Sequence, residues 1–167
     1  MKYIFIHGLE SSGKGFKGKF FKRTIPGILT PTFEPFDPFI SNKMLLDKRM
    51  KQLIEVLSPK EPWILIGSSF GGLMASLYAL ENPKKVEKMV LLAPLLATMD
   101  LEPSNYEYFT KPVVIFHGKN DNVIPIGPTR KRAEKVFQDL SYIIVDDDHM
   151  LHKTVESLNW LELLRIN

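Results

Sequence analysis

Short apolar runs recur along the chain, and each has the length of one β-strand. They occupy residues 3–6, 63–66, 89–92, 113–116 and 142–145, and a weaker run spans residues 27–33. Strands that are apolar on both faces are typical of a parallel sheet covered by helices on both sides. The pattern therefore predicts a buried sheet of about six strands.

Helical periodicity fills the intervals between these runs. Apolar residues recur at helical spacing over residues 44–57, 73–80 and 133–137, and again over a C-terminal segment, 151–161. Pro83 follows the second segment and predicts its end. Strand–helix alternation over the whole length predicts an α/β fold with a doubly wound, mostly parallel sheet. In such sheets ligands bind at the carboxyl ends of the strands.

One domain accounts for the whole chain. A length of 167 residues suits a single domain, 1–167, with a sizeable core, and there is no internal repeat. The proline-rich stretch 31–38 is interpreted as a loop after the weak second strand. No apolar run approaches the roughly 20 residues that cross a bilayer, and the first residues lack a signal-peptide pattern. We therefore expect a soluble, cytoplasmic protein with no membrane partner.

Composition and charge exclude several classes of function. Hydrophobic residues make up 44% and charged residues 25% of the chain, which is ordinary for a globular protein. The absence of cysteine excludes disulfides and thiolate metal sites. The formal net charge is +3, and basic residues are dispersed among acidic ones, so we expect no nucleic-acid partner.

The strongest chemical signal lies where the apolar run 63–66 meets a helical segment. Residues 67–72 read Gly-Ser-Ser-Phe-Gly-Gly, which contains G-x-S-x-G in the strand–turn–helix context that presents a nucleophile. A turn this tight strains the backbone of Ser69, and side chains at Gly67 and Gly71 would clash. It also directs the Phe70 N–H toward a developing oxyanion. The alternative is an ordinary turn rich in glycine and serine.

His149 is the candidate general base, which a serine hydroxyl needs at neutral pH. It follows the apolar run 142–145 and precedes the last helical segment. This is the expected place in the chain order of serine, acid and histidine. Taken alone, His149 would be interpreted as a histidine of a surface loop, and the serine motif is what favours the base.

Asp121 is the candidate acid, because it follows the apolar run 113–116. From that loop its carboxylate could accept the His149 ring N–H and fix the tautomer. The alternative is an aspartate of a plain turn, since its neighbours are turn-forming residues. Asp100 is the second candidate, and the aspartates at 146–148 rank lower because a side chain is poorly aimed at its neighbour's ring.

A second oxyanion donor is expected from the loop after the first strand. That loop begins with His7-Gly8-Leu9, and we expect the Leu9 N–H to face Ser69. His7 precedes the turn, so it is interpreted as bracing the loop rather than as a base. His117 stands before a glycine in the same way and receives the same interpretation, whereas His152 is interpreted as a surface residue.

Four segments occur in the order found in one enzyme superfamily: His7-Gly8, residues 67–72, His117-Gly118 with Asp121, and His149. Through these segments, which are spread from residue 7 to residue 149, the chain resembles the α/β-hydrolase superfamily along its whole length. More narrowly, residues 7–12 and 67–72 resemble the small bacterial YqiA-like esterases. The resemblance implies hydrolysis of a carboxylic ester or thioester through an acyl-enzyme, with no metal and no organic cofactor.

The chain departs from larger members of that superfamily in two respects. Two strands usually precede the His-Gly strand, and here that strand begins at residue 3. Only about 20 residues, 93–112, occupy the place where a cap domain often sits, which is too few for independent stability. We therefore expect a minimal fold without a cap domain. Apolar residues of the bordering loops could line an acyl pocket or pack into the core: Phe36, Leu95, Tyr106 and Phe109.

A basic run follows the first loop, with members Lys14, Lys17, Lys19, Lys22 and Arg23. One interpretation is a solvated helix face. The other is a basic rim that attracts anionic substrates such as phosphate-bearing thioesters.

The sequence thus favours a serine esterase or thioesterase that acts on a small-molecule acyl substrate. Two alternatives stay open. One is a non-catalytic interaction protein that has kept the hydrolase scaffold. The other is a peptide or carbon–carbon bond hydrolase that uses the same triad, because fold does not decide chemistry.

Overall fold

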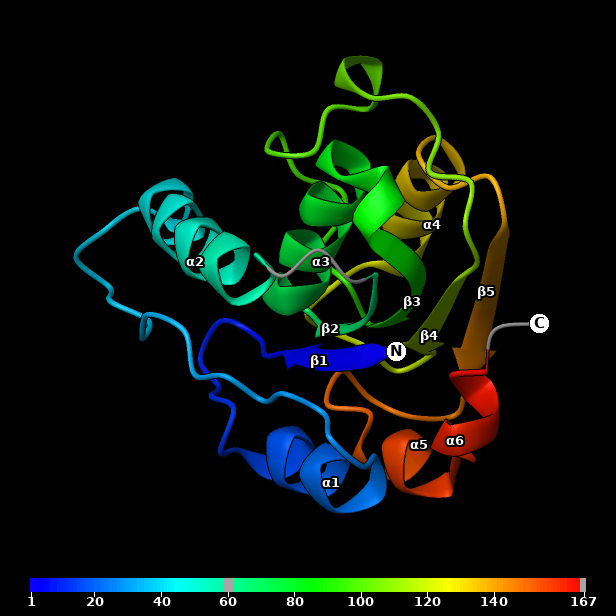
Figure 1. Cartoon of the computed structure of the whole chain (residues 1–167). Helices are drawn as coiled ribbons and strands as arrows, with labels where there is room; N and C mark the ends of the chain where they lie inside the picture. Colours follow the sequence, from blue (N-terminus) through cyan, green and yellow to red (C-terminus); the bar gives the residue numbers. More distant parts are fainter. Residues whose placement is uncertain (59–61, 166–167) are drawn as a thin grey trace.

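A single parallel sheet forms the centre of the molecule. The computed structural model describes residues 1–58 and 62–165 (Figure 1). The sheet has five strands, in the order β1 (Lys2–Ile6), β2 (Trp63–Ser68), β3 (Val86–Leu92), β4 (Val113–Gly118) and β5 (Leu140–Val145). Every neighbouring pair is parallel. The predicted α/β class and parallel sheet are confirmed, with a strand count close to the expected one.

The weaker apolar run around Leu29 does not form a full strand. Leu29 lies beside β1, where its carbonyl accepts from the Phe5 N–H at 2.8 Å and its N–H donates to the Tyr3 carbonyl at 2.9 Å. Gly27 has a positive φ of 75°, which ends extended structure on one side. Pro31 has no N–H to donate on the other side. The sixth strand is therefore reduced to one bridge within the described chain.

Helices cover both faces of the sheet, as a doubly wound fold requires (Figure 1). One face carries α1 (Phe16–Thr24), α5 (His152–Ser157) and α6 (Trp160–Leu163). The other face carries α2 (Asn42–Val56), α3 (Phe70–Glu81) and α4 (Ile126–Glu134). Two short 3₁₀ helices, η1 (Pro83–Lys85) and η2 (Pro103–Asn105), lie in connections. The β3–β4 connection holds η2 and no cap domain among its residues, all of which are described.

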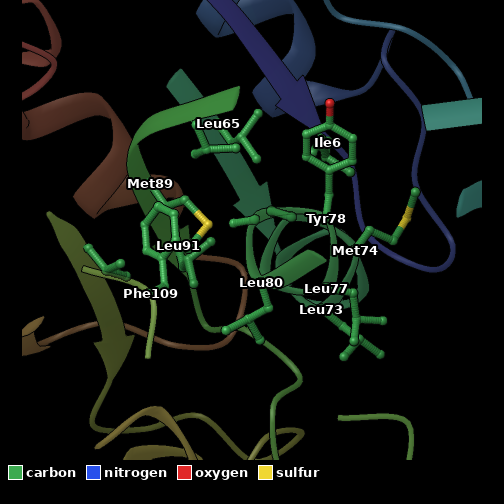
Figure 2. Close-up of a cluster of buried hydrophobic side chains, with 14 of the residues drawn as sticks. Ile6, Leu65, Leu73, Met74, Leu77, Tyr78, Leu80, Met89, Leu91 and Phe109 are labelled. Atoms are coloured by element: carbon green, nitrogen blue, oxygen red, sulfur yellow. The ribbon is translucent and has the colours of Figure 1, made fainter. Parts of the chain in front are cut away.

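The core explains why the strands are apolar at every position. All six residues of β2 are buried, and successive side chains enter opposite layers. Ile64 and Ile66 pack in the layer of α1 and α6. Leu65 packs in the other layer with Met74 and Tyr78 of α3, a cluster drawn in Figure 2. Within the described chain, no helix is long and apolar enough to cross a membrane.

Two predicted helices differ from the structure. The C-terminal segment forms α5 and α6 rather than one helix, because Leu158 is extended and the Asn159 side chain caps α6 by accepting from the Glu162 N–H at 3.3 Å. The Trp160 indole N–H donates to the Val155 carbonyl at 2.8 Å and folds α6 against α5. Helix α4 begins earlier than predicted, after Pro125, and ends before the buried residues at 136 and 137.

Candidate active site

The turn between β2 and α3 holds Ser69 in a strained conformation. Ser69 has φ 52° and ψ −114°, a region that residues with side chains rarely adopt. A Cβ on Gly67 would lie 2.6 Å from the Gly71 carbonyl oxygen. A Cβ on Gly71 would collide with the carbonyl oxygens of Ile6 and His7. The predicted strain and the steric need for both glycines are therefore present.

Backbone hydrogen bonds keep this turn against the sheet. The Ser69 N–H donates to the Leu92 carbonyl at the end of β3 at 2.9 Å. The Ser69 carbonyl accepts from the Gly72 N–H at 2.9 Å and from the Leu95 N–H at 3.0 Å. The surrounding structure thus determines the conformation of Ser69 from three directions.

Two backbone N–H groups near Ser69 are free to bind an oxygen atom. Phe70 is the first residue of α3, and Leu9 lies in the loop after β1. That loop packs on the turn that carries Ser69, because a Cβ on Gly8 would lie 3.6 Å from the Ser69 Cβ. Among the described residues, neither the Leu9 nor the Phe70 N–H has a hydrogen-bond acceptor. The sequence analysis named these two N–H groups as oxyanion donors, and that role stays a prediction.

His149 and Asp121 are joined by a hydrogen bond. The His149 Nδ1 lies 2.8 Å from Oδ2 of Asp121, whose side chain is fully buried. The other oxygen, Oδ1, accepts from the N–H groups of Val123 and Ile124, both at 2.8 Å. Burial alone would raise the pKa of Asp121, but these N–H groups and the His149 ring lower it below its ordinary value. The acid is therefore a carboxylate at neutral pH.

The other aspartates considered as the acid contact different groups. Asp100 contacts the Thr98 hydroxyl, Asp146 pairs with Lys119, Asp147 accepts from Thr154, and Asp148 accepts from the Met150 N–H. Among the described residues, the ion pair of His149 is with Asp121 alone. The geometry therefore favours Asp121 over the alternatives.

His117 belongs to the same group of side chains, which the sequence analysis did not foresee. Its Nε2 lies 3.0 Å from the Ile124 carbonyl oxygen and 3.2 Å from Oδ2 of Asp121. Its Nδ1 lies 2.6 Å from the Tyr142 hydroxyl oxygen. The bracing role expected for His117 thus extends to the carboxylate itself. The spacing of His117 and Asp121 after one strand was the available signal.

A cavity of about 490 Å³ brings these residues together. Its lining includes Ser69 and His149, so their side chains reach the same side of the sheet. In the described structure no hydrogen bond joins the Ser69 hydroxyl to His149. Catalytic hydrogen bonds often tighten only when substrate binds. We name this space the Ser69 cavity.

The apolar lining of the Ser69 cavity differs from the expected acyl pocket. Leu95 lines it as expected. Phe109 instead lies fully in the core, and Tyr106 packs against that core, so the core-packing interpretation describes both. Phe36 is partly exposed and outside the cavity lining. The remaining apolar lining includes Val123 and Ile124, which follow shortly after Asp121, and Met150, which follows His149; the sequence analysis did not consider these residues.

The basic run divides into two environments. Lys14, Lys19, Lys22 and Arg23 are exposed, as expected for a solvated helix face. Lys17 lines the Ser69 cavity, and none of the ion pairs within the described chain includes it. Burial lowers the pKa of Lys17 to about 8, although Asp147 and Asp148 oppose the shift. His152 also differs from its expected surface position, because its ring stacks on Phe16 at 3.8 Å.

Comparison with known proteins identifies the fold. The family model described as alpha/beta hydrolase fold matches residues 45–107. Alpha/beta hydrolase domain-containing protein 10 from mouse is similar in structure, with a TM-score of 0.73 and 18% identity over 98% of this chain and 90% of that one. No curated protein matches the sequence.

Two further solved structures show the same likeness. A monoacylglycerol lipase from Paleococcus ferrophilus has a TM-score of 0.70 and 17% identity, over 96% of this chain and 93% of that one. Est1E from Butyrivibrio proteoclasticus, with ferulic acid bound, has a TM-score of 0.72 and 14% identity over 98% and 90%. These likenesses show that the chain has the α/β-hydrolase fold.

Proposed function

We propose that this protein is a serine hydrolase that cleaves carboxylic esters or thioesters of small molecules through an acyl-enzyme. One observation carries the proposal. The buried carboxylate of Asp121 holds the His149 ring at the cavity where a strained turn presents Ser69. This placement of a serine, a histidine and an aspartate from three different strand ends supports their proposed roles as nucleophile, base and acid of a catalytic triad.

In the proposed reaction, the Ser69 hydroxyl oxygen attacks the acyl carbon while His149 Nε2 accepts its proton. Asp121 accepts the Nδ1–H of His149 and stabilises the imidazolium that forms. The N–H groups of Leu9 and Phe70 donate to the oxyanion. The tetrahedral intermediate expels the alcohol or thiol, which receives the proton from His149. Water then attacks the acyl-enzyme by the same route and releases the acid.

The nature of the cavity lining supports an acyl substrate. Leu95, Val123 and Ile124 offer an apolar surface for an acyl chain. A monoacylglycerol lipase and Est1E with ferulic acid bound are among the structurally similar proteins, and the narrower resemblance to YqiA-like esterases is consistent with ester chemistry. Lys17 and Glu10 add one basic and one acidic side chain to this lining.

A fluorophosphonate probe and a panel of nitrophenyl esters of rising chain length, with a thioester control, test the proposal. Wild-type protein should be labelled and should turn over at least one ester, and Ser69→Ala should abolish both. Ser68→Ala is the matched control, because Ser68 is adjacent but lies outside the proposed triad. Folded wild-type protein that resists the probe would indicate a non-catalytic scaffold. Labelling with turnover of only peptides or carbon–carbon bonds would indicate the other alternative.

A further inference from the structure

A buried arginine touches the loop that carries one proposed oxyanion donor. Arg49 of α2 is fully buried, and no ion pair among the described residues includes it. Its donors go to three backbone carbonyls: Nε to Glu34 at 2.8 Å, Nη1 to Gly8 at 3.0 Å and Nη2 to Leu9 at 2.7 Å. Burial lowers the pKa of Arg49 to about 10, so it stays charged at neutral pH.

The same guanidinium reaches the second proposed donor residue. Its central carbon lies 5.3 Å from the centroid of the Phe70 ring, a cation–π contact. Arg49 thus contacts both residues whose N–H groups are proposed to bind the oxyanion, although it does not line the cavity itself. Burying a charge costs free energy unless hydrogen-bond partners replace the lost water. The three carbonyl partners of Arg49 therefore indicate a specific structural role.

The contact with Gly8 acts on Leu9 through one peptide group. The Gly8 carbonyl and the Leu9 N–H belong to the same amide. That carbonyl accepts from Arg49 at 3.0 Å, and the His7 Nδ1 lies 2.8 Å from it. Hydrogen bonds to a carbonyl polarise its amide and strengthen the N–H as a donor. The bond to the Leu9 carbonyl fixes the other side of the same residue.

We propose that Arg49 is a positioning residue that orients and polarises the Leu9 N–H of the oxyanion hole. The inference rests on the proposed hydrolase function. Because the oxyanion develops only in the transition state, loss of Arg49 lowers kcat and leaves KM nearly unchanged. A residue that served stability alone would change neither parameter in the folded fraction.

Arg49→Lys tests this role, because lysine keeps the charge but lacks the planar fork that reaches three carbonyls. We expect kcat for the best nitrophenyl ester to fall about 10- to 100-fold, with KM changed by no more than about threefold. Gln52→Leu is the matched control. Gln52 lies on the same helix and accepts from the Glu34 N–H at 2.7 Å, but it does not contact Gly8 or Leu9. It should lose stability and keep kcat.

A second readout does not depend on activity. The amide proton resonance of Leu9 should shift upfield in Arg49→Lys and stay in place in Gln52→Leu. Should Arg49→Lys not fold, Arg49→Gln, which retains a neutral donor, takes its place. Equal kcat in wild type and the Arg49 variant, equal losses in both variants, or an unmoved Leu9 resonance would each overturn the inference. Wild-type protein inert to esters and probe would instead overturn the proposed function, while the Leu9 resonance still tests the contact.

Discussion

Two His-Gly pairs end two strands of the sheet, His7-Gly8 after β1 and His117-Gly118 in β4. Both histidines are fully buried, and burial lowers the pKa of each, to about 4 for His7. Their protons nevertheless lie on opposite ring nitrogens. His7 Nε2 accepts from the Phe33 N–H at 2.9 Å, so its proton is on Nδ1.

His117 has the reverse arrangement. Its Nε2 faces the Ile124 carbonyl and the Asp121 carboxylate, so that nitrogen carries the proton, and Nδ1 accepts from the Tyr142 hydroxyl. The difference shows how the two sides of the Ser69 cavity are built. Backbone groups and Arg49 organise the side of His7, whereas the side of His117 is organised around a carboxylate.

The largest expected effect comes from replacing the Asp121 carboxylate, around which the His117 side of the cavity is organised. In Asp121→Asn, the amide oxygen should stay on the N–H groups of Val123 and Ile124, which places the NH₂ group toward His149. Because an NH₂ group needs an acceptor, His149 Nδ1 would lose its proton and Nε2, the proposed base, would carry it. Esterase turnover should therefore fall about 10⁴-fold with the fold intact.

Asp146→Asn is the control for that change, because Asp146 lies three residues before His149 but is exposed and pairs with Lys119. Its turnover should match wild type. An Asp121→Asn protein that keeps more than a tenth of wild-type kcat would show that the carboxylate does not set the tautomer of His149.

The next largest effect is the pH dependence of stability that the buried, neutral His7 produces on the other side of the Ser69 cavity. The pKa of His7 falls from 6.5 in the unfolded chain to about 4 in the folded protein. Burial is the main cause of this shift, and the Arg49 charge adds to it. The unfolded state therefore binds more protons in this window, and stability falls as pH decreases through it. The free energy of unfolding in urea should lose about 3 kcal/mol from His7 between pH 7 and pH 4.

His7→Gln isolates that contribution, since a glutamine carbonyl can still accept from the Phe33 N–H. His117 remains in both proteins and contributes with the same sign. Asp121 has a lowered pKa, so its contribution is present above its ordinary pKa and is lost only below pH 4. If the free energy of unfolding of His7→Gln varies with pH as steeply as that of wild type, His7 does not stay neutral in the folded protein.

The comparison also shows what the sequence could predict. The structure brings Ser69 and His149 to one cavity and joins His149 to Asp121, and the sequence can predict this because each residue follows an apolar strand and parallel strands end at one edge of the sheet. The contacts of Arg49 with Gly8 and Leu9 join residues about 40 positions apart, and no local pattern encodes such a contact.

The misassigned elements have physical reasons of the same kind. Phe109 has an apolar side chain on a loop beside the site, as a pocket residue would, but tertiary packing against Phe137 places it in the core. The C-terminal periodicity predicted one helix because it registered apolar spacing and not the cap formed by Asn159. Apolar periodicity locates buried faces well, and it does not decide where a chain turns.

The smallest expected effect compares the two glycines directly. A Cβ on Gly118 would collide with the carbonyl oxygens of Asp147 and Asp148, just before His149, whereas a Cβ on Gly8 would meet Ser68 O at 3.5 Å and Ser69 Cβ at 3.6 Å, ordinary contacts. Gly118→Ala should therefore lower the free energy of unfolding by about 2 kcal/mol, as overpacking does.

Gly8→Ala should stay within about 0.5 kcal/mol of wild type in the same urea titration. Neither glycine has a positive φ, so backbone strain contributes to neither value. Similar losses in the two variants would mean that the loops beside Ser69 and His149 are equally closely packed. Unequal losses in the expected direction would show that the His149 loop depends on direct backbone packing against β4, and that the Gly8 loop has room for a methyl group beside Ser69.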